Sequence, residues 1–179
     1  MKNIDRRSTA RRAIAALLLL GAMVAGAAED AAAPPAKPCS APQAGQFDFW
    51  VGEWDLSWGD GERGRNTVSR ILGGCVVQEQ FEGSAKQPFR GMSVSVYDPD
   101  ADLWRQTWVD DQGGYLDFTG GMQDGRMILS RTGTVKGNTV HQRMVFYNIA
   151  ADSFDWDWET SRDGGRTWEL RWRIHYQRR

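Results

Sequence analysis

From residue 47 onward the sequence predicts an all-β domain, an antiparallel up-and-down β-barrel of about ten strands. Short segments of alternating apolar and polar residues recur at spacings of roughly ten residues. Gly, Asp and Asn, which favour turns, separate these segments. No amphipathic helical pattern appears after residue 46. Closure into a barrel is the most economical arrangement for so many strands because it removes exposed edges.

The turn residues between the alternating segments predict where each strand begins and ends. The first begins in the aromatic cluster near Trp50, and later strands follow turns such as Gly59-Asp60-Gly61, Gly73-Gly74, Asp124-Gly125 and Asp163-Gly164-Gly165. Each turn supplies residues that tolerate positive φ or accept local hydrogen bonds. The predicted strands are 50–58, 64–72, 76–83, 89–97, 103–110, 115–120, 126–132, 139–147, 153–161 and 167–177.

Period-two alternation predicts which side chains face the barrel interior. In the last strand, every second side chain is apolar and most of those between are charged. One face of the strand is therefore expected to contact the core and the other to contact water. The same argument applies to strands 153–161 and 103–110. The predicted inner residues are Trp168, Leu170, Trp172, Ile174 and Tyr176, then Phe154, Trp156, Trp158 and Thr160, and finally Trp104, Gln106 and Trp108.

The first 27 residues are expected to be a signal peptide. Five basic residues come first, an apolar run reaches about Val24, and Ala25-Gly26-Ala27 ends the segment. This run is shorter than the roughly 20 apolar residues of a membrane span. The arginine pairs leave twin-arginine export open as an alternative route. Residues 28–46, rich in Ala and Pro, are expected to be a flexible leader, and residues 47–179 a single barrel domain.

Charge and cysteine content agree with an exported protein. Removal of residues 1–27 takes away five basic residues and one acid, which changes the formal net charge from -1 to -5. A mildly acidic chain has no electrostatic reason to bind nucleic acid. No later segment predicts a membrane anchor. The two cysteines, Cys39 and Cys75, predict a disulfide in an oxidising compartment, periplasmic or extracellular.

Several motifs resemble known families. Phe47-Asp48-Phe49-Trp50-Val51-Gly52-Glu53-Trp54 resembles the start of a large bacterial family of exported proteins known only as a domain of unknown function. Further matching segments are Gly73–Glu79, Gly91–Ser93, Trp104–Asp110 and Ser161–Trp168. The opening also resembles the first strand of lipocalin-like calycins and of nitrobindin-type haem barrels. The resemblance implies a calycin-like β-barrel and no particular activity.

Nine tryptophans make an aromatic-walled cavity the main functional hypothesis. A solid aromatic core is the alternative. Gln106 lies between Trp104 and Trp108 on the same predicted face, and a buried amide there requires a hydrogen-bond partner, which favours a wet pocket. The candidate ligand-binding residues are Trp54, Trp104, Gln106, Trp108, Trp156 and Trp158.

No cofactor is predicted. Haem would need an axial ligand, and the chain offers only His141, of ambiguous parity, and His175, on the predicted solvent face. Asp98, Asp100 and Asp102 lack the Gly and the distal Glu of an EF-hand and predict a solvated turn. The Ser161-x-Asp163-x-Gly165-x-Thr167-Trp168 segment resembles an Asp-box and predicts a structural hairpin.

Three function classes remain open on sequence alone. The favoured one is a non-enzymatic barrel that binds a small apolar or aromatic molecule. A second is a hydrolase acting on an envelope or carbohydrate substrate with Asp or Glu as acid and base, although the adjacent Asp110 and Asp111 are expected to point to opposite faces. A third is an interaction module without a pocket, which an exposed aromatic patch would favour. Oligomeric state is not predicted.

Overall fold

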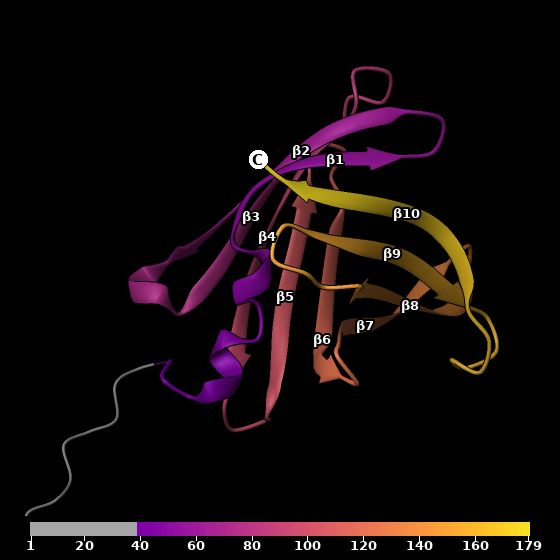
Figure 1. The fold of residues 1–179 in the computed structure, drawn as a ribbon. Coiled ribbons are helices and arrows are strands. Elements are labelled where there is room, and N and C mark those ends of the chain that lie inside the picture. The colour runs from indigo at the N-terminus through magenta and orange to yellow at the C-terminus, as the bar shows by residue number, and fades with distance from the viewer. Residues whose placement is uncertain (1–38) are drawn as a thin grey trace, which may run out of the picture. The chain divides into compact units, whose positions relative to one another are not determined.

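A computed structural model describes residues 39–179, which form a closed ten-strand antiparallel β-barrel of the calycin/lipocalin type (Figure 1). Each strand pairs with its neighbours in sequence, and β1 and β10 close the ring. The signal peptide predicted for residues 1–27, and the leader as far as residue 38, lie outside the described residues. The strands are β1 Gly52–Trp58, β2 Glu62–Ile71, β3 Val76–Glu82, β4 Arg90–Asp98, β5 Leu103–Asp110, β6 Tyr115–Gln123, β7 Arg126–Val135, β8 Asn138–Tyr147, β9 Ser153–Ser161 and β10 Glu169–Arg178.

The fold confirms the prediction of an up-and-down barrel, with ten strands near the ten predicted positions. Strand β2 begins two residues earlier than expected, at Glu62, and β6 continues to Gln123. In β8 the inner residues are Val140, Met144 and Phe146, so His141 has the outer parity.

The first predicted strand begins two residues too early. Residues Asp48–Trp50 form the short 3-10 helix η2, and β1 starts at Gly52. Another 3-10 helix, η1 (Pro42–Gly45), precedes it, in a segment expected to belong to the leader. Gly52 has φ 144°, a conformation that L side chains rarely adopt, so it allows the chain to turn from η2 into the strand.

The two 3-10 helices close one end of the barrel with aromatic side chains, and we call residues 42–50 the plug. Phe47 is fully buried, and its ring contacts Trp104 at a centroid distance of 4.8 Å and Phe146 at 5.6 Å. Trp104 donates from Nε1 to Gln46 Oε1 at 3.1 Å. These contacts join the plug to the start of β5 and the end of β8, so this end of the barrel is filled.

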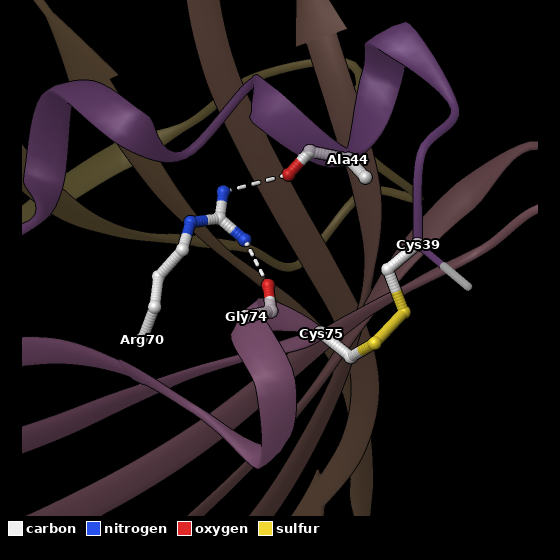
Figure 2. The surroundings of a disulfide bond; sticks show 5 residues. All are labelled: Cys39, Ala44, Arg70, Gly74 and Cys75. Carbon is white, nitrogen blue, oxygen red and sulfur yellow. Dashed lines mark hydrogen bonds between the residues drawn. A yellow bond between two sulfur atoms is a disulfide. The ribbon is translucent and has the colours of Figure 1, made fainter. Parts of the chain in front are cut away.

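A disulfide and an arginine hold the plug to the β2–β3 connection (Figure 2). Cys39 and Cys75 are bonded, with their Cα atoms 5.2 Å apart, which confirms the predicted bridge. Arg70 donates from Nη2 to the Ala44 carbonyl at 2.7 Å and from Nη1 to the Gly74 carbonyl at 2.8 Å. The guanidinium therefore connects the plug to the turn formed by the third 3-10 helix, η3 (Leu72–Gly74).

The inward face predicted for residues 168–176 is wrong at its N-terminal end. A β-bulge between Leu170 and Trp172 shifts the register against β9. Because one extra residue reverses the alternation, Leu170 lies on the outer side with 45% exposure, while Ile174 and Tyr176 are buried inside. Trp168 precedes the strand and packs against the Arg143 guanidinium at 4.0 Å instead of entering the barrel.

Residues 39–179 include no helix with the length and hydrophobicity that crossing a bilayer requires.

Candidate functional site

A cavity of about 230 Å³ lies in the barrel beyond the plug, whose Trp50 is one of the lining residues. It lies toward the ends of β3, β5 and β9 and the start of β10, and several of the tryptophans around it are only half-buried, so it reaches the surface there. Apolar and aromatic side chains dominate the walls. The lining residues are Trp50, Glu79, Phe81, Phe89, Trp108, Asp110, Leu116, Phe118, Met144, Phe146, Trp156, Trp158, Trp172, Ile174 and Tyr176.

Three tryptophans from β9 and β10 form one wall of the cavity. Trp156 and Trp158 project from β9 on the same face, and their rings are nearly parallel, with centroids 6.5 Å apart. Trp172 from β10 stands edge-on to Trp156 at 5.8 Å. Trp172 also contacts Phe81 of β3 edge-on at 5.9 Å. Neighbouring strands thus present both ring faces and ring edges, an arrangement that suits a flat apolar ligand.

A glycine on β4 makes room for the tryptophan on the next strand. A Cβ atom at Gly91 would lie 2.0 Å from the Trp108 ring, closer than any side chain permits. The indole therefore packs against β4 at Gly91, and its Nε1 donates to Asp110 Oδ2 at 3.1 Å. Gly91 and Asp110 together fix the orientation of Trp108 in the cavity wall.

A buried carboxyl group lies at the cavity floor. Glu79 of β3 is only 6% exposed, and its two oxygens accept hydrogen bonds from Asn66 Nδ2 and from Ser93 Oγ, both at 2.7 Å. Asn66 Nδ2 also donates to the Tyr176 hydroxyl at 3.2 Å. Among the described residues three buried side-chain atoms have no hydrogen-bond partner: Trp50 Nε1, Asn66 Oδ1 and Arg131 Nε. Beside Glu79, the Asn66 oxygen is therefore an acceptor that remains available.

Burial is the main cause of the shifted pKa values of Glu79 and Tyr176. Removal from water raises the pKa of Glu79 to about 7, although the hydrogen bonds from Ser93 and Asn66 oppose the shift. Burial likewise raises the pKa of Tyr176 well above its usual value, and the nearby Glu79 charge adds to this effect. Glu79 is therefore protonated to a much greater extent near neutral pH than an exposed glutamate, while the Tyr176 hydroxyl remains neutral.

Asp110 is the second carboxylate that lines the cavity, and its environment differs. Burial opposes its ionisation, but hydrogen bonds from the Gly114 amide, Trp108 Nε1 and the Gln112 amide outweigh burial and lower its pKa. Asp110 Oδ1 accepts both amides, so this side chain stabilises the turn between β5 and β6. Asp110 remains ionised at neutral pH.

The six ligand-binding residues predicted from sequence divide into two groups. Trp108, Trp156 and Trp158 line the cavity. Trp54 and Trp104 are fully buried on the plug side, where Trp54 Nε1 donates to the Trp50 carbonyl at 2.8 Å, and neither lines the cavity. Gln106 is buried and donates to Ser95 Oγ at 2.9 Å, so a neighbouring strand satisfies the amide.

Sequence reasoning missed the polar floor formed by Glu79, Asn66, Ser93 and Tyr176. A signal for Glu79 was present in its own strand, because it shares parity with the apolar Val77 and Phe81. A carboxylate on an apolar face either carries function or has buried partners. Asn66 and Ser93 carry no such signal, since they become its partners only through the register of β2 and β4 on β3.

The remaining sequence candidates lie away from the cavity. His175 is about half exposed and bonds Asp155 through Nδ1 at 2.8 Å, and His141 contacts Thr132. Within residues 39–179 neither histidine lines the cavity, and no His, Cys, Asp and Glu group there could hold a metal ion. Asp98 caps its own turn by accepting the Asp100 and Ala101 amides.

A scan against protein-family models and a search of curated proteins found no match to this chain.

Proposed function

We propose that this protein binds a small, flat, apolar or aromatic molecule in the tryptophan-lined cavity. The observation that carries the proposal is the cavity itself: one end of the barrel is filled by the plug, whereas the other holds about 230 Å³ of space between aromatic walls. This volume is below the roughly 300–1,000 Å³ of drug-sized ligand sites, which favours a compact ligand of at most about three aromatic rings. A pocket of this kind argues for ligand binding over a pocket-free interaction module.

Titration with N-phenyl-1-naphthylamine tests this function, because its fluorescence rises in apolar surroundings. We expect saturable binding to the wild-type protein. The substitution Trp156→Ala removes one stacking face and should weaken binding by about two- to twelvefold, since an aromatic pair contributes about 0.5–1.5 kcal/mol beyond its area.

The matched control is Trp168→Ala, which removes a tryptophan that packs outside the barrel on Arg143. This variant should bind the probe as the wild type does. Absence of saturable binding to the wild-type protein, or equal affinities for wild type and Trp156→Ala, would contradict the proposal.

One observation favours the hydrolase hypothesis: two carboxyl groups with pKa values shifted in opposite directions line the same cavity. Asp110, however, already accepts three hydrogen bonds within its own turn, which reduces its capacity as a base. The geometry therefore supports binding better than catalysis. Hydrolysis of 4-nitrophenyl glycosides that is lost in Glu79→Gln would reverse this preference.

We further propose that the protein acts in the periplasm or outside the cell and is related to the exported bacterial family and the calycins that its opening motif resembles. The Cys39–Cys75 disulfide supports an oxidising location. The basic, apolar and Ala-rich start of the chain supports export.

A further inference from the structure

The ionisable groups that line the cavity are all acidic. Glu79 lies at the floor, Asp110 lines the wall, and the Tyr176 hydroxyl adds a weak acid. No Lys, Arg or His within residues 39–179 lines the cavity. Arg131 lies behind the wall, with its guanidinium 5.9 Å from the Phe118 ring centroid. It donates to Gln142 and lies 3.8 Å from Asp117, which offsets its charge, while its buried Nε has no hydrogen-bond partner.

Aromatic walls add to this acidic character. The face of an indole or phenyl ring carries negative electrostatic potential and attracts a cation, with Trp giving the strongest interaction. Trp108, Trp156, Trp158 and Trp172 surround the same space as the two carboxyl groups. Carboxylates and aromatic faces together favour a positively charged ligand and disfavour an anionic one.

We propose that the cavity selects an organic cation: a protonated amine carried on a flat apolar body, with the ammonium group at the Glu79 carboxylate and the body against the tryptophans. This inference rests on the proposed binding function and names its ligand class. A carboxylate can accept about four hydrogen bonds, and Glu79 accepts only those from Asn66 and Ser93, so an ammonium N–H has an acceptor available.

Binding of such a cation is coupled to ionisation of Glu79. The neutral carboxylic acid transfers its proton to solvent, and the resulting carboxylate pairs with the ammonium group. Burial holds the pKa of Glu79 near 7 in the empty cavity, and a cation beside it lowers that value. The groups that face Glu79 are Asn66 from β2, Ser93 from β4 and Tyr176 from β10. Of these only Tyr176 is titratable, and it stays neutral throughout the range tested.

The experiment compares 1-naphthylmethylamine with its neutral counterpart 1-naphthalenemethanol by isothermal titration calorimetry between pH 5.5 and 8. We expect the wild-type protein to prefer the amine at pH 8, and its affinity for the amine to rise about tenfold or more across this range. Affinity for the alcohol should not rise. Titrations at pH 6 in two buffers of different ionisation enthalpy should show close to one proton released per amine bound.

Two variants locate the effect. Glu79→Gln should lose the preference for the amine and its pH dependence, whereas Glu82→Gln, at an exposed outer position on the same strand, should behave like the wild type. If Glu79→Gln does not fold, the wild-type pH profile and the comparison of the two compounds decide the question.

Equal affinities for the two compounds, affinity that falls as pH rises, or an unaltered Glu79→Gln variant would overturn the inference. If N-phenyl-1-naphthylamine binds while the amine does not, the ligand class is wrong and the binding function stands. If no probe binds, the proposed function itself fails.

Discussion

At the scale of single residues, Glu79 combines features that rarely occur together: a carboxyl group that is almost fully buried, hydrogen-bonded on both oxygens and without a cation in contact. Desolvation disfavours its charged form more than its two hydrogen bonds favour it. Ionisation of Glu79 therefore lowers the free energy of unfolding of the protein when the cavity is empty.

The raised pKa of Glu79 predicts that the free energy of unfolding depends on pH. The pKa of Glu79 is raised from 4.5 to about 7, so between these values the folded protein binds a proton that the unfolded chain does not. The contribution of Glu79 is thus fully present below pH 4.5 and is lost as pH rises to 7, with a total change of about 3 kcal/mol.

Urea unfolding at pH 5 and pH 8 measures this change. The pH-dependent loss should be about 2 to 3 kcal/mol smaller in Glu79→Gln than in the wild type, since Glu79 in the unfolded chain is already partly ionised at pH 5. The control Glu82→Gln changes an exposed glutamate of the same strand and should retain the wild-type dependence. The same pH dependence in all three proteins would contradict the assigned role of burial.

At the scale of elements, the β9–β10 hairpin depends on one aspartate. Asp163 accepts hydrogen bonds from the Arg166 and Thr167 amides at 3.0 and 2.9 Å, from Thr167 Oγ1 at 2.6 Å and from Ser161 Oγ at 2.8 Å. These bonds lower the pKa of Asp163 far below its usual range. The turn is therefore organised by an ionised side chain, as the Asp-box pattern predicts.

Replacing Asp163 with Ala should open this hairpin locally, because two backbone amides lose their acceptor. Hydrogen exchange at Arg166 and Thr167 should accelerate, while exchange in β4 and β5 stays as in the wild type. Asp60→Ala is a suitable control because Asp60 lies in the exposed β1–β2 turn. Unchanged exchange in Asp163→Ala would show that the side chain does not hold the turn.

At the scale of the whole molecule, the two ends of the barrel differ in construction. Plug aromatics, Arg70 and the disulfide fill one end, whereas the other end holds the cavity. The ten strands close independently of the disulfide through continuous pairing from β1 to β10. The bridge therefore limits the freedom of the unfolded chain and of the plug without being needed for the barrel.

Loss of the bridge is expected to lower the free energy of unfolding by about 4 kcal/mol, given the 36-residue separation of its cysteines. Chemical denaturation of the double variant Cys39→Ser, Cys75→Ser against the oxidised wild type measures this difference. Far-UV circular dichroism should retain the β signal. Collapse of that signal, or identical unfolding midpoints at an unchanged denaturant slope, would contradict the assigned role.

The sequence by itself determined the local features of this protein. Alternation and turn residues predicted ten strands and, apart from the start of the last strand, the faces assigned to them, since both depend only on neighbours along the chain. Two cysteines predicted a disulfide, and clustered tryptophans predicted an aromatic interior that includes Trp108, Trp156 and Trp158.

Only the tertiary structure decided which part of the barrel interior is packed by the plug and which part is a cavity. Trp54 and Trp104 have the same alternation as the cavity tryptophans, yet the plug packs near them because its 3-10 helices reach across one barrel end. The bulge near Arg171 turned Leu170 outward, since one inserted residue reverses a period of two. The partners of Glu79 come from strands β2, β4 and β10, and strand register, which is not a local property, brings them together.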